Sequence, residues 1–525
     1  MFFRFLPAAV LISIVIFLPL TDEKNLSRNE VPAAYDWLQF GGNAQHDSAN
    51  YVESIITPAN VSQLKMQFHV KLPDVADGAP SYLSQSMVNS VGHDVLFLTT
   101  RDGHLLAVDA HTGQMLWSKH YGPGNCITNN AGDGIPCYTT SSPAIDPNRQ
   151  FVYSYGLDGN VHKVKVADGQ EVLGDGWPEL STLKGFDEKE SSALSIATAK
   201  NGVSYLYAVD AGYPSYAADH PGDEGDYQGH VTTVNLATGA QTVFNATCSD
   251  QAVHFVEKGG LPDCSNVQSA IWGRPGVVYD ADTDKIYMTT GNGVFNETNH
   301  SWGDTLFALN PDGTGLHGNP LDSYTPLTFD QDAATDLDMG SSSPVILPPV
   351  VGSPLPHLAL QTGKDAQVRL LNLDNLSNHP GGPQPGNLGG ALADIDIPQG
   401  GEVHTQPAIW KYEADGSVWV FITTESTGTS ALQIKFDGKA WHIVPMWANT
   451  ISGTSPIVAN GVLYYAGEDK TFYAFEPFTG TLLWKTPLGS VHWESPVIAN
   501  GWLYITDNYR YLTAYALPNS PGSFR

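Results

Sequence analysis

Two distant stretches of the chain repeat one pattern, DGHLLAVDAHTGQMLW at 102–117 and DKTFYAFEPFTGTLLW at 469–484. In each stretch, residues of alternating polarity lead to a Thr-Gly turn, and a second apolar run ends on a tryptophan. Alternation with a period of two is typical of a β-strand, and glycine readily adopts the positive φ of a tight turn. The pattern therefore predicts a β-hairpin that recurs along the chain.

Weaker copies of the hairpin lie between these two stretches. They read DGNVHKVKVADGQEVL from 158, GHVTTVNLATGAQTVF from 229 and DTLFALNPDGTG from 304. A strand start containing proline precedes most hairpins, with the residue before the proline at Ser142, Ser343, Gln406, Ser455 and Ser495. Each repeated unit is therefore expected to contain about four strands.

The number of repeated units follows from the number of hairpin turns. Seven units are marked by Gly113, Gly169, Gly239, Gly313, Asn375, Gly438 and Gly480, and an eighth begins at Ser495 and stops at Leu517 after three strands. The segment LKMQFHVKL at 64–72 alternates like the missing outer strand, and its pairing with the last unit would close a ring without exposed sheet edges.

We therefore predict an all-β fold, an eight-bladed β-propeller of four-stranded antiparallel blades closed by the N-terminal strand. It occupies residues 35–517 as one domain, and 518–525 form a C-terminal tail. Seven blades is the alternative, because the unit at 401–449 is irregular in sequence.

Composition restricts the partners of this chain of 525 residues. Acidic residues number 54 and basic residues 25, which gives a formal net charge of -29. Such a charge disfavours nucleic acid as a partner. Because 42% of the residues are hydrophobic, the acidity is expected on the surface of a folded protein and not in a disordered tail.

The beginning of the chain resembles a targeting segment. Residues 1–20 contain a basic residue followed by an apolar run, and 21–34 are a polar linker, so we expect a signal peptide or an uncleaved signal anchor and a periplasmic or secreted protein. No later segment is expected to cross a membrane. The absence of a CxxCH motif means that the sequence encodes no covalently attached c-type haem.

Export would permit disulfide bonds. The four cysteines form two local pairs along the chain, Cys126 with Cys137 and Cys248 with Cys264. Three connectivities are possible, and the local one is favoured. A metal site is a weaker interpretation, because the cysteines have no CxxC spacing.

The repeated residues also resemble a known family. Ala107, Asp109, Gly113 and Trp117, whose spacing recurs from Ala474 to Trp484, resemble the tryptophan-docking motif of quinoprotein dehydrogenases and propellers like those that bind pyrroloquinoline quinone (PQQ). The segments WLQFGGN from 37 and ITPANVSQL from 56 resemble the start of a quinoprotein. Non-catalytic propellers of outer-membrane assembly share the docking repeats, so the resemblance implies the fold more strongly than the activity.

Further similarities imply the residues of a central site. The block IWGRPGVVYDADTDKIYMTTGNGVFNET from 271 is similar to the fourth-blade signature of the family, which implies that Trp272 stacks on the cofactor and that Asn292 binds calcium. Counting back from Gly239, the calcium-binding glutamate falls on Glu224, for which Asp223 or Asp226 could substitute.

The base and the quinone-binding cation come from two later segments. TDLDMGSSSP resembles the segment that carries the catalytic aspartate, which implies Asp338 as base and metal ligand, with Asp336 as the competing choice. QTGKDAQVRLLNLD from 361 is similar to the strand whose basic residue bonds the quinone oxygens, which implies that role for Lys364. His404 and residues 491–494 are further candidates to line the pocket.

The resemblance implies a PQQ- and Ca²⁺-dependent dehydrogenase that oxidises an alcohol or sugar hydroxyl of a small-molecule or polymeric substrate. Electrons would pass to a separate acceptor, a c-type cytochrome or a membrane quinone. Two departures weaken this expectation, because Cys126 and Cys137 are not adjacent and no arginine lies between Cys126 and Pro147. The alternative is a non-catalytic propeller that binds other proteins.

Overall fold

The recurring hairpins fold into the strands of a ring, seen in a computed structural model that describes residues 1, 34–122, 137–185, 187–212, 226–257, 259–520 and 522. Contacts divide the chain into Met1–Ala33 and Ala34–Arg525. The signal segment expected at 1–20 lies outside the described residues except for Met1. The description below concerns the second unit.

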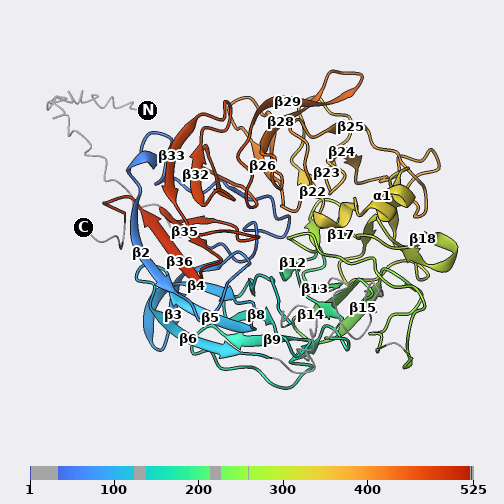
Figure 1. Ribbon diagram of the computed structural model, residues 1–525, viewed down its shortest axis with the longest axis horizontal. Coiled ribbons are helices and arrows are strands. Elements are labelled where there is room, and N and C mark those ends of the chain that lie inside the picture. The colour runs from blue at the N-terminus through green and yellow to red at the C-terminus, as the bar shows by residue number, and fades with distance from the viewer. Residues whose placement is uncertain are drawn as a thin grey trace. The chain divides into compact units, whose positions relative to one another are not determined.

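The described part of Ala34–Arg525 contains eight sheets, each built on four antiparallel strands, which are the blades of a propeller (Figure 1), and two of these sheets carry a fifth short strand. The first four blades consist of β3 (Ser81–Val88), β4 (Val91–Thr99), β5 (His104–Asp109) and β6 (Met115–His120); β7 (Ala144–Ile145), β8 (Phe151–Tyr155), β9 (Asn160–Lys165) and β10 (Glu179–Leu180); β12 (Ser195–Thr198), β13 (Ser204–Gly212), β14 (His230–Asn235) and β15 (Gln241–Asn245); and β16 (Val278–Asp280), β17 (Lys285–Thr289), β20 (Leu306–Leu309) and β21 (Asp322–Tyr324).

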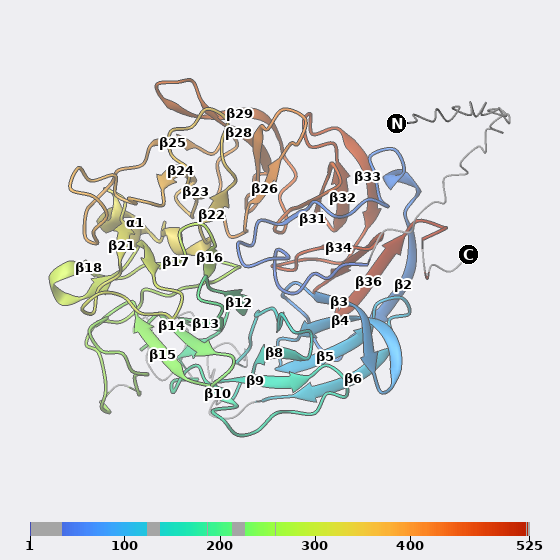
Figure 2. The same ribbon diagram turned by 180° about the vertical axis from the view of Figure 1, so that it is seen from behind.

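The last four blades complete the ring. They consist of β22 (Val345–Leu347), β23 (Leu358–Gln361), β24 (Gln367–Asn372) and β25 (Ala393–Asp396); β26 (Ala408–Lys411), β27 (Val418–Thr423), β28 (Thr429–Phe436) and β29 (Trp441–Asn449); β30 (Ile457–Ala459), β31 (Val462–Gly467), β32 (Thr471–Phe475) and β33 (Leu482–Pro487); and β34 (Val497–Ala499), β35 (Trp502–Thr506), β36 (Tyr511–Ala516) and β2 (Lys65–Lys71). Figure 2 shows that β12, β16 and β22 lie near the middle of the ring.

Short elements decorate the blades. β1 (Ala49–Asn50) pairs in parallel with β30, β11 (Glu188–Lys189) pairs with β13, and β18 (Phe295–Asn296) pairs with β19 (Ser301–Trp302). The helical elements are η1 (Val61–Gln63), η2 (Glu297–Asn299), α1 (Phe329–Thr335) and η3 (Met339–Ser341).

Ring closure by the N-terminal strand is confirmed. β2 pairs antiparallel with β36, from Lys65 opposite Ala516 to Lys71 opposite Tyr511. The segment that looked irregular at 401–449 contains the regular blade β26–β29, so the described chain has eight blades and not seven. The strand that the last unit lacks is therefore supplied from the other end of the chain.

The tryptophan of the repeat connects one blade to the next. Trp117 lies on the turn of the second blade, where a Cβ on Gly169 would come within 2.8 Å of its ring. The Trp117 indole N–H also donates to the carbonyl of Val166 at 3.1 Å. Where the ring closes, side chains of β2 pack on the turn of the first blade, because a Cβ on Gly113 would lie 2.8 Å from Val70 and 2.9 Å from Phe68. Glycine is required at these turns because φ is positive and the neighbouring blade is close.

The hydrophobic core is divided among the spaces between blades. One cluster joins buried residues of the fifth and sixth blades, such as Val368 and Val420, and another joins the closing blade to its neighbours around Trp502. Cys248 and Cys264 form the expected disulfide, with an S–S distance of 2.04 Å. The other expected pair cannot be followed, because Cys126 lies outside the described residues.

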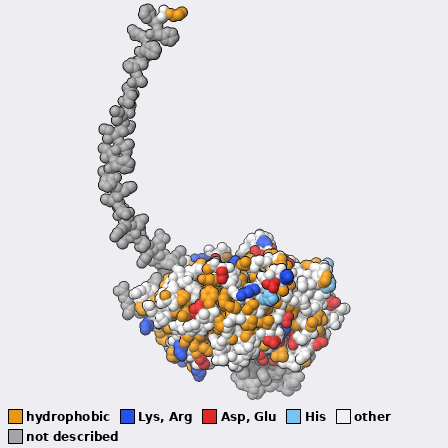
Figure 3. All heavy atoms as spheres, turned by 90° about the horizontal axis from the view of Figure 1, so that it is seen from above, with side chains coloured by type: hydrophobic (Ala, Val, Ile, Leu, Met, Phe, Trp, Pro, Cys, Tyr) orange, Lys and Arg blue, Asp and Glu red, His pale blue; other side chains and the backbone are white. Residues whose placement is uncertain are grey.

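The surface agrees with the composition. On the face drawn in Figure 3, basic side chains are scattered, and several of them lie beside acidic side chains. No helix among the described residues has the length and apolar character needed to cross a bilayer.

Candidate functional site

Four of the five site residues inferred from sequence meet between the fourth and fifth blades. Trp272 precedes β16, Asn292 follows β17, Asp338 precedes η3, and Lys364 lies in the turn between β23 and β24. We call Trp272, Asn292, Asp336, Asp338 and Lys364 the axial cluster. The fifth inferred residue, Glu224, lies outside the described residues.

Lys364 is at the centre of the axial cluster. Its Nζ lies 2.9 Å from Asp338 Oδ2, 2.6 Å from Asp336 Oδ1 and 4.9 Å from the centroid of the Trp272 ring. The Trp272 indole N–H donates to Asp338 Oδ1 at 3.2 Å. One ammonium group therefore contacts two carboxylates and an aromatic face.

The two aspartates differ in burial. The Asp338 side chain is 2% exposed, whereas that of Asp336 is 73% exposed. The backbone also fixes Asp338, because the N–H of Lys364 donates to the Asp338 carbonyl at 3.0 Å. Gly291 makes room for this arrangement, since a Cβ there would lie 2.8 Å from Asp338 Oδ1.

Burial and charge act against each other within the cluster. Burial raises the pKa of Asp338 above its usual range, although Lys364 opposes this shift. Burial alone would lower the pKa of Lys364, but the attraction of Asp338 and Asp336 raises it. Nearby, burial raises the pKa of Asp304 to about 8, and its carboxylate accepts the backbone N–H of Met339 at 2.8 Å.

Asn292 presents an oxygen suited to a metal ion. Its amide nitrogen donates to Asp336 Oδ1 at 2.7 Å, while its buried Oδ1 has no hydrogen-bond partner. A buried carbonyl oxygen without a donor is costly in a folded protein unless a ligand satisfies it. Asn292 Oδ1 and the carboxylates of Asp336 and Asp338 are all oxygen donors, the type of ligand that a hard cation such as Ca²⁺ prefers.

The segment that follows Glu224 runs close to Asn292. The Gln268 N–H donates to the Tyr227 carbonyl at 2.7 Å, and the next residue, Ser269, donates to the Asn292 carbonyl at 2.6 Å. Asp226, one of the suggested substitutes for Glu224, has Oδ2 at 3.7 Å from Lys184 Nζ. The other substitute, Asp223, lies outside the described residues.

Aromatic residues from the sixth and eighth blades extend the cluster. The His404 ring lies 5.6 Å from that of Trp272, and the Trp493 ring lies 6.2 Å from it. Each nitrogen of His404 lies 2.9 Å from a carboxylate oxygen, one of Glu402 and one of Glu425. His404 and Trp493 therefore lie beside Trp272, and their role in lining a pocket stays a prediction.

Sequence reasoning missed the basic residues beside these aromatics. The buried Arg274 donates to the Ser191 carbonyl at 2.8 Å and to the Thr140 carbonyl at 3.1 Å. Its guanidinium also lies 5.2 Å from the Trp493 ring centroid, and burial lowers its pKa to about 10. Arg274 therefore joins segments from several blades behind the axial cluster.

Two further cations flank the ring of Tyr138. Lys189 Nζ lies 3.7 Å and the Arg101 guanidinium 4.5 Å from its centroid. Burial, reinforced by Arg101, lowers the pKa of Lys189 to about 7. Basic groups thus lie near Cys137, in the region where the sequence lacks the expected arginine.

Comparing the repeats would have found Arg101, because it occupies in blade one the turn position that Lys364 occupies in blade five.

Two family models match the chain. Residues 37–305 match the model described as the glucose/ethanol/alcohol dehydrogenase β-propeller domain, and residues 410–518 match that of the outer membrane protein assembly factor BamB. A relative in Gluconobacter oxydans (strain 621H), the dehydrogenase subunit of a quinone alcohol dehydrogenase, is 26% identical over 336 residues. That match covers 58% of this chain, and the chain spans only 40% of the relative's length.

Solved structures share the fold. A quinohemoprotein alcohol dehydrogenase from Pseudomonas putida HK5 has a TM-score of 0.61 at 14% identity, with 93% of this chain and 81% of that one covered. A europium-containing methanol dehydrogenase also has a TM-score of 0.61 at 14% identity, with 92% and 98% covered. Because the first family model spans more than half of the sequence, the chain belongs to the glucose, ethanol and alcohol dehydrogenase family of β-propellers.

Proposed function

We propose that the protein is a PQQ-dependent dehydrogenase that oxidises the hydroxyl group of an alcohol or sugar. The observation that carries this proposal is the convergence of Trp272, Asn292, Asp338 and Lys364 within a propeller of the alcohol dehydrogenase family. The four residues come from separate stretches of the sequence, and a merely structural propeller has no need to bring them together.

The residues of the axial cluster fit a quinone cofactor and a metal ion. Trp272 would provide a flat apolar surface for the cofactor ring. Asn292 Oδ1 and the Asp338 carboxylate, together with Glu224, would bind Ca²⁺. PQQ, when bound, supplies the hydride-accepting chemistry.

The chain's own residues would handle the proton and the charge. Asp338 would accept the proton of the substrate hydroxyl, since it is buried and aligned by two donors, Lys364 and the Trp272 indole. Lys364 would donate a hydrogen bond to a cofactor oxygen on which negative charge develops. The cation also offsets the repulsion between its neighbouring carboxylates.

We also propose that the protein is exported to the periplasm or secreted and passes electrons to a separate c-type cytochrome or membrane quinone. The Cys248–Cys264 disulfide supports an oxidising compartment, because such bonds are rare in the cytosol. The lack of CxxCH in the chain supports a separate acceptor.

Reconstitution tests the cofactor and the reaction. The full-length protein, freed of metal, would be titrated with PQQ in the presence of Ca²⁺ or a trivalent lanthanide, while tryptophan fluorescence and dye reduction are followed over alcohols and sugars. We expect saturable quenching and dye reduction with at least one substrate. Trp272→Ala should abolish this quenching. Trp441→Ala, which changes a tryptophan on the outer strand β29, is the control and should preserve it. Neither PQQ binding nor dye reduction under any of these conditions would overturn the proposal.

A second candidate is a non-catalytic propeller that binds other proteins, favoured by the match of residues 410–518 to an assembly-factor model. It predicts that Asp338→Asn leaves every phenotype of the producing cell unchanged and that affinity purification recovers a stable partner. Loss of the phenotype in Asp338→Asn, with the protein still folded, would reject this candidate.

A further inference from the structure

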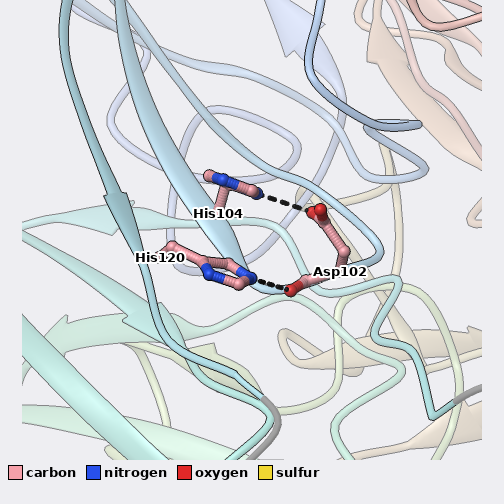
Figure 4. Close-up of side chains that lie close together, drawn as sticks. All are labelled: Asp102, His104 and His120. Carbon is pink, nitrogen blue, oxygen red and sulfur yellow. Dashed lines mark hydrogen bonds and ion pairs between the residues drawn. The ribbon is translucent and has the colours of Figure 1, made fainter.

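Blade one carries a second group of reactive side chains, Asp102, His104 and His120 (Figure 4). His104 is the first residue of β5 and His120 the last of β6, and the antiparallel register places them directly opposite each other. Their rings stack at 4.1 Å between centroids and 21° between planes. The register of the sheet therefore joins two histidines that the sequence keeps apart.

The atoms of the three residues that could bind a metal ion face one another. His104 Nδ1 lies 2.8 Å from Asp102 Oδ1, and His120 Nε2 lies 2.9 Å from the Asp102 carbonyl oxygen. One ligand atom from each of the three side chains lies within 4.8 Å of the others. Because carboxylate and carbonyl oxygens only accept hydrogen bonds, both inward nitrogens carry a hydrogen in this arrangement.

Neighbouring groups hold the carboxylate in place. The Thr100 hydroxyl donates to Asp102 Oδ1 at 2.6 Å and accepts a hydrogen bond from the backbone N–H of His104 at 3.0 Å. Gly122 leaves the donors uncrowded, because a Cβ there would lie only 3.2 Å from the Asp102 carbonyl oxygen and 3.3 Å from His120 Nε2. Such outer contacts are those that orient ligands in metal sites.

The group is also open to water. The side chains of Asp102 and His104 are 39% and 22% exposed, and His120 is exposed. An ion can therefore enter from solvent and keep water molecules as additional ligands. Two imidazoles and one carboxylate are a donor set for first-row transition ions and not for Ca²⁺.

We propose that Asp102, His104 and His120 bind a divalent transition-metal ion, Zn²⁺ or Cu²⁺, through two imidazole nitrogens and a carboxylate oxygen. On binding, the hydrogen of each neutral ring moves from the inward to the outward nitrogen, and the inward nitrogen presents its lone pair to the ion. This site is separate from the axial cluster and does not depend on the proposed dehydrogenase activity.

Isothermal titration of the full-length protein with Zn²⁺, after chelation and with Ca²⁺ restored, tests the site. We expect one equivalent to disappear in the double variant His104→Gln/His120→Gln, and His120→Gln alone to weaken that equivalent at least about tenfold. Substitution with Co²⁺ should give visible absorption that the double variant lacks. His357→Gln, which removes a histidine paired with Asp374 at the surface, is the matched control and should leave binding unchanged.

Two outcomes would overturn the proposal. One is a wild-type protein that takes up no Zn²⁺ or Cu²⁺ at micromolar free concentration. The other is a double variant with unchanged unfolding midpoint and unchanged stoichiometry, above all if His404→Gln removes the equivalent instead and so assigns the ion to Glu402, His404 and Glu425. Because His120 is exposed, its single variant keeps the test valid even if the double variant folds poorly.

Discussion

Two turns have similar backbone conformations but different side-chain contacts. One lies between β4 and β5 in blade one, and the other lies between β23 and β24 in blade five. The first reads TRDGH from 100 and the second GKDAQ from 363. In both, the N–H of the fourth residue donates to the carbonyl of the first, Gly103 to Thr100 at 2.9 Å and Ala366 to Gly363 at 3.3 Å. The fourth residue also has positive φ in both, 87° at Gly103 and 57° at Ala366.

The side chains of the two turns serve different neighbours. In blade five the cation Lys364 bonds Asp338 and lies over Trp272, whereas in blade one the cation Arg101 lies over Tyr138. At the start of the next strand, blade one has His104 where blade five has Gln367. The repeat thus supplies positions of equal geometry, and the residue at each position decides which neighbouring side chains it contacts.

The largest expected effect separates the two aspartates bonded to Lys364. Under the proposed function, Asp338→Asn should lower kcat by about 10²–10⁴-fold, because it removes a proton acceptor and keeps the shape of the side chain. Asp336→Asn should lower kcat by no more than about tenfold, since that side chain is 73% exposed and its ion pair is screened by water. Steady-state dye reduction at saturating PQQ and metal measures both values.

Equal PQQ affinity in the two variants is the control, because it shows that the loss lies in turnover and not in assembly of the site. If Asp336→Asn caused the larger loss, the exposed carboxylate would be the base. Blade five would then place its chemistry at the surface, as blade one does.

The next effect concerns stability. Lys364→Met leaves the buried Asp338 without its cation, and breaking a buried pair costs about 3–5 kcal/mol, here reduced because Lys364 is partly exposed. Without the opposing cation, the folded-state pKa of Asp338 rises further above its unfolded value. The folded variant then binds a proton more tightly than the unfolded chain, so its stability falls as the pH rises above about 4.

The difference in unfolding free energy between wild type and Lys364→Met should therefore be larger at pH 7.5 than at pH 5 in metal-free buffer. Denaturant unfolding at the two pH values measures it, and Lys165→Met, which removes a surface lysine bonded to Gln170, is the control. A difference independent of pH would show that Lys364 contributes packing and not charge.

Most of the fold, but only part of the site, could be predicted from the sequence. Alternating strands and Thr-Gly turns depend on local preferences, and these were enough to count eight blades and to pair β2 with β36. Trp272, Asn292, Asp338 and Lys364 were found together because each lies in a short stretch that resembles a family segment. The burial that distinguishes Asp338 from Asp336 depends on tertiary packing, which no local pattern contains.

Contacts set by register or by several blades at once were missed. His104 and His120 meet only because β5 and β6 pair with these residues opposite each other. No local pattern around Arg274 indicates its contacts, because its partners Thr140 and Ser191 come from loops of other blades. Spacing along one chain reports neither kind of contact, whereas aligning the repeats with one another would have pointed to Arg101.

The smallest expected effect tests whether the two turns are equivalent in energy. Gly103→Ala should destabilise the protein by about 1–3 kcal/mol, because φ is positive and the added Cβ would lie 2.5 Å from the Tyr121 carbonyl oxygen. Ala366→Gly should change stability by no more than about 0.5 kcal/mol, since relief of the left-handed conformation is offset by the greater freedom of glycine in the unfolded chain. Denaturant midpoints at unchanged slope measure both. Equal and opposite changes in the free energy of unfolding would contradict this expectation. Blade one would then need glycine at position 103 only for its positive φ and not because the chain at Tyr121 lies close.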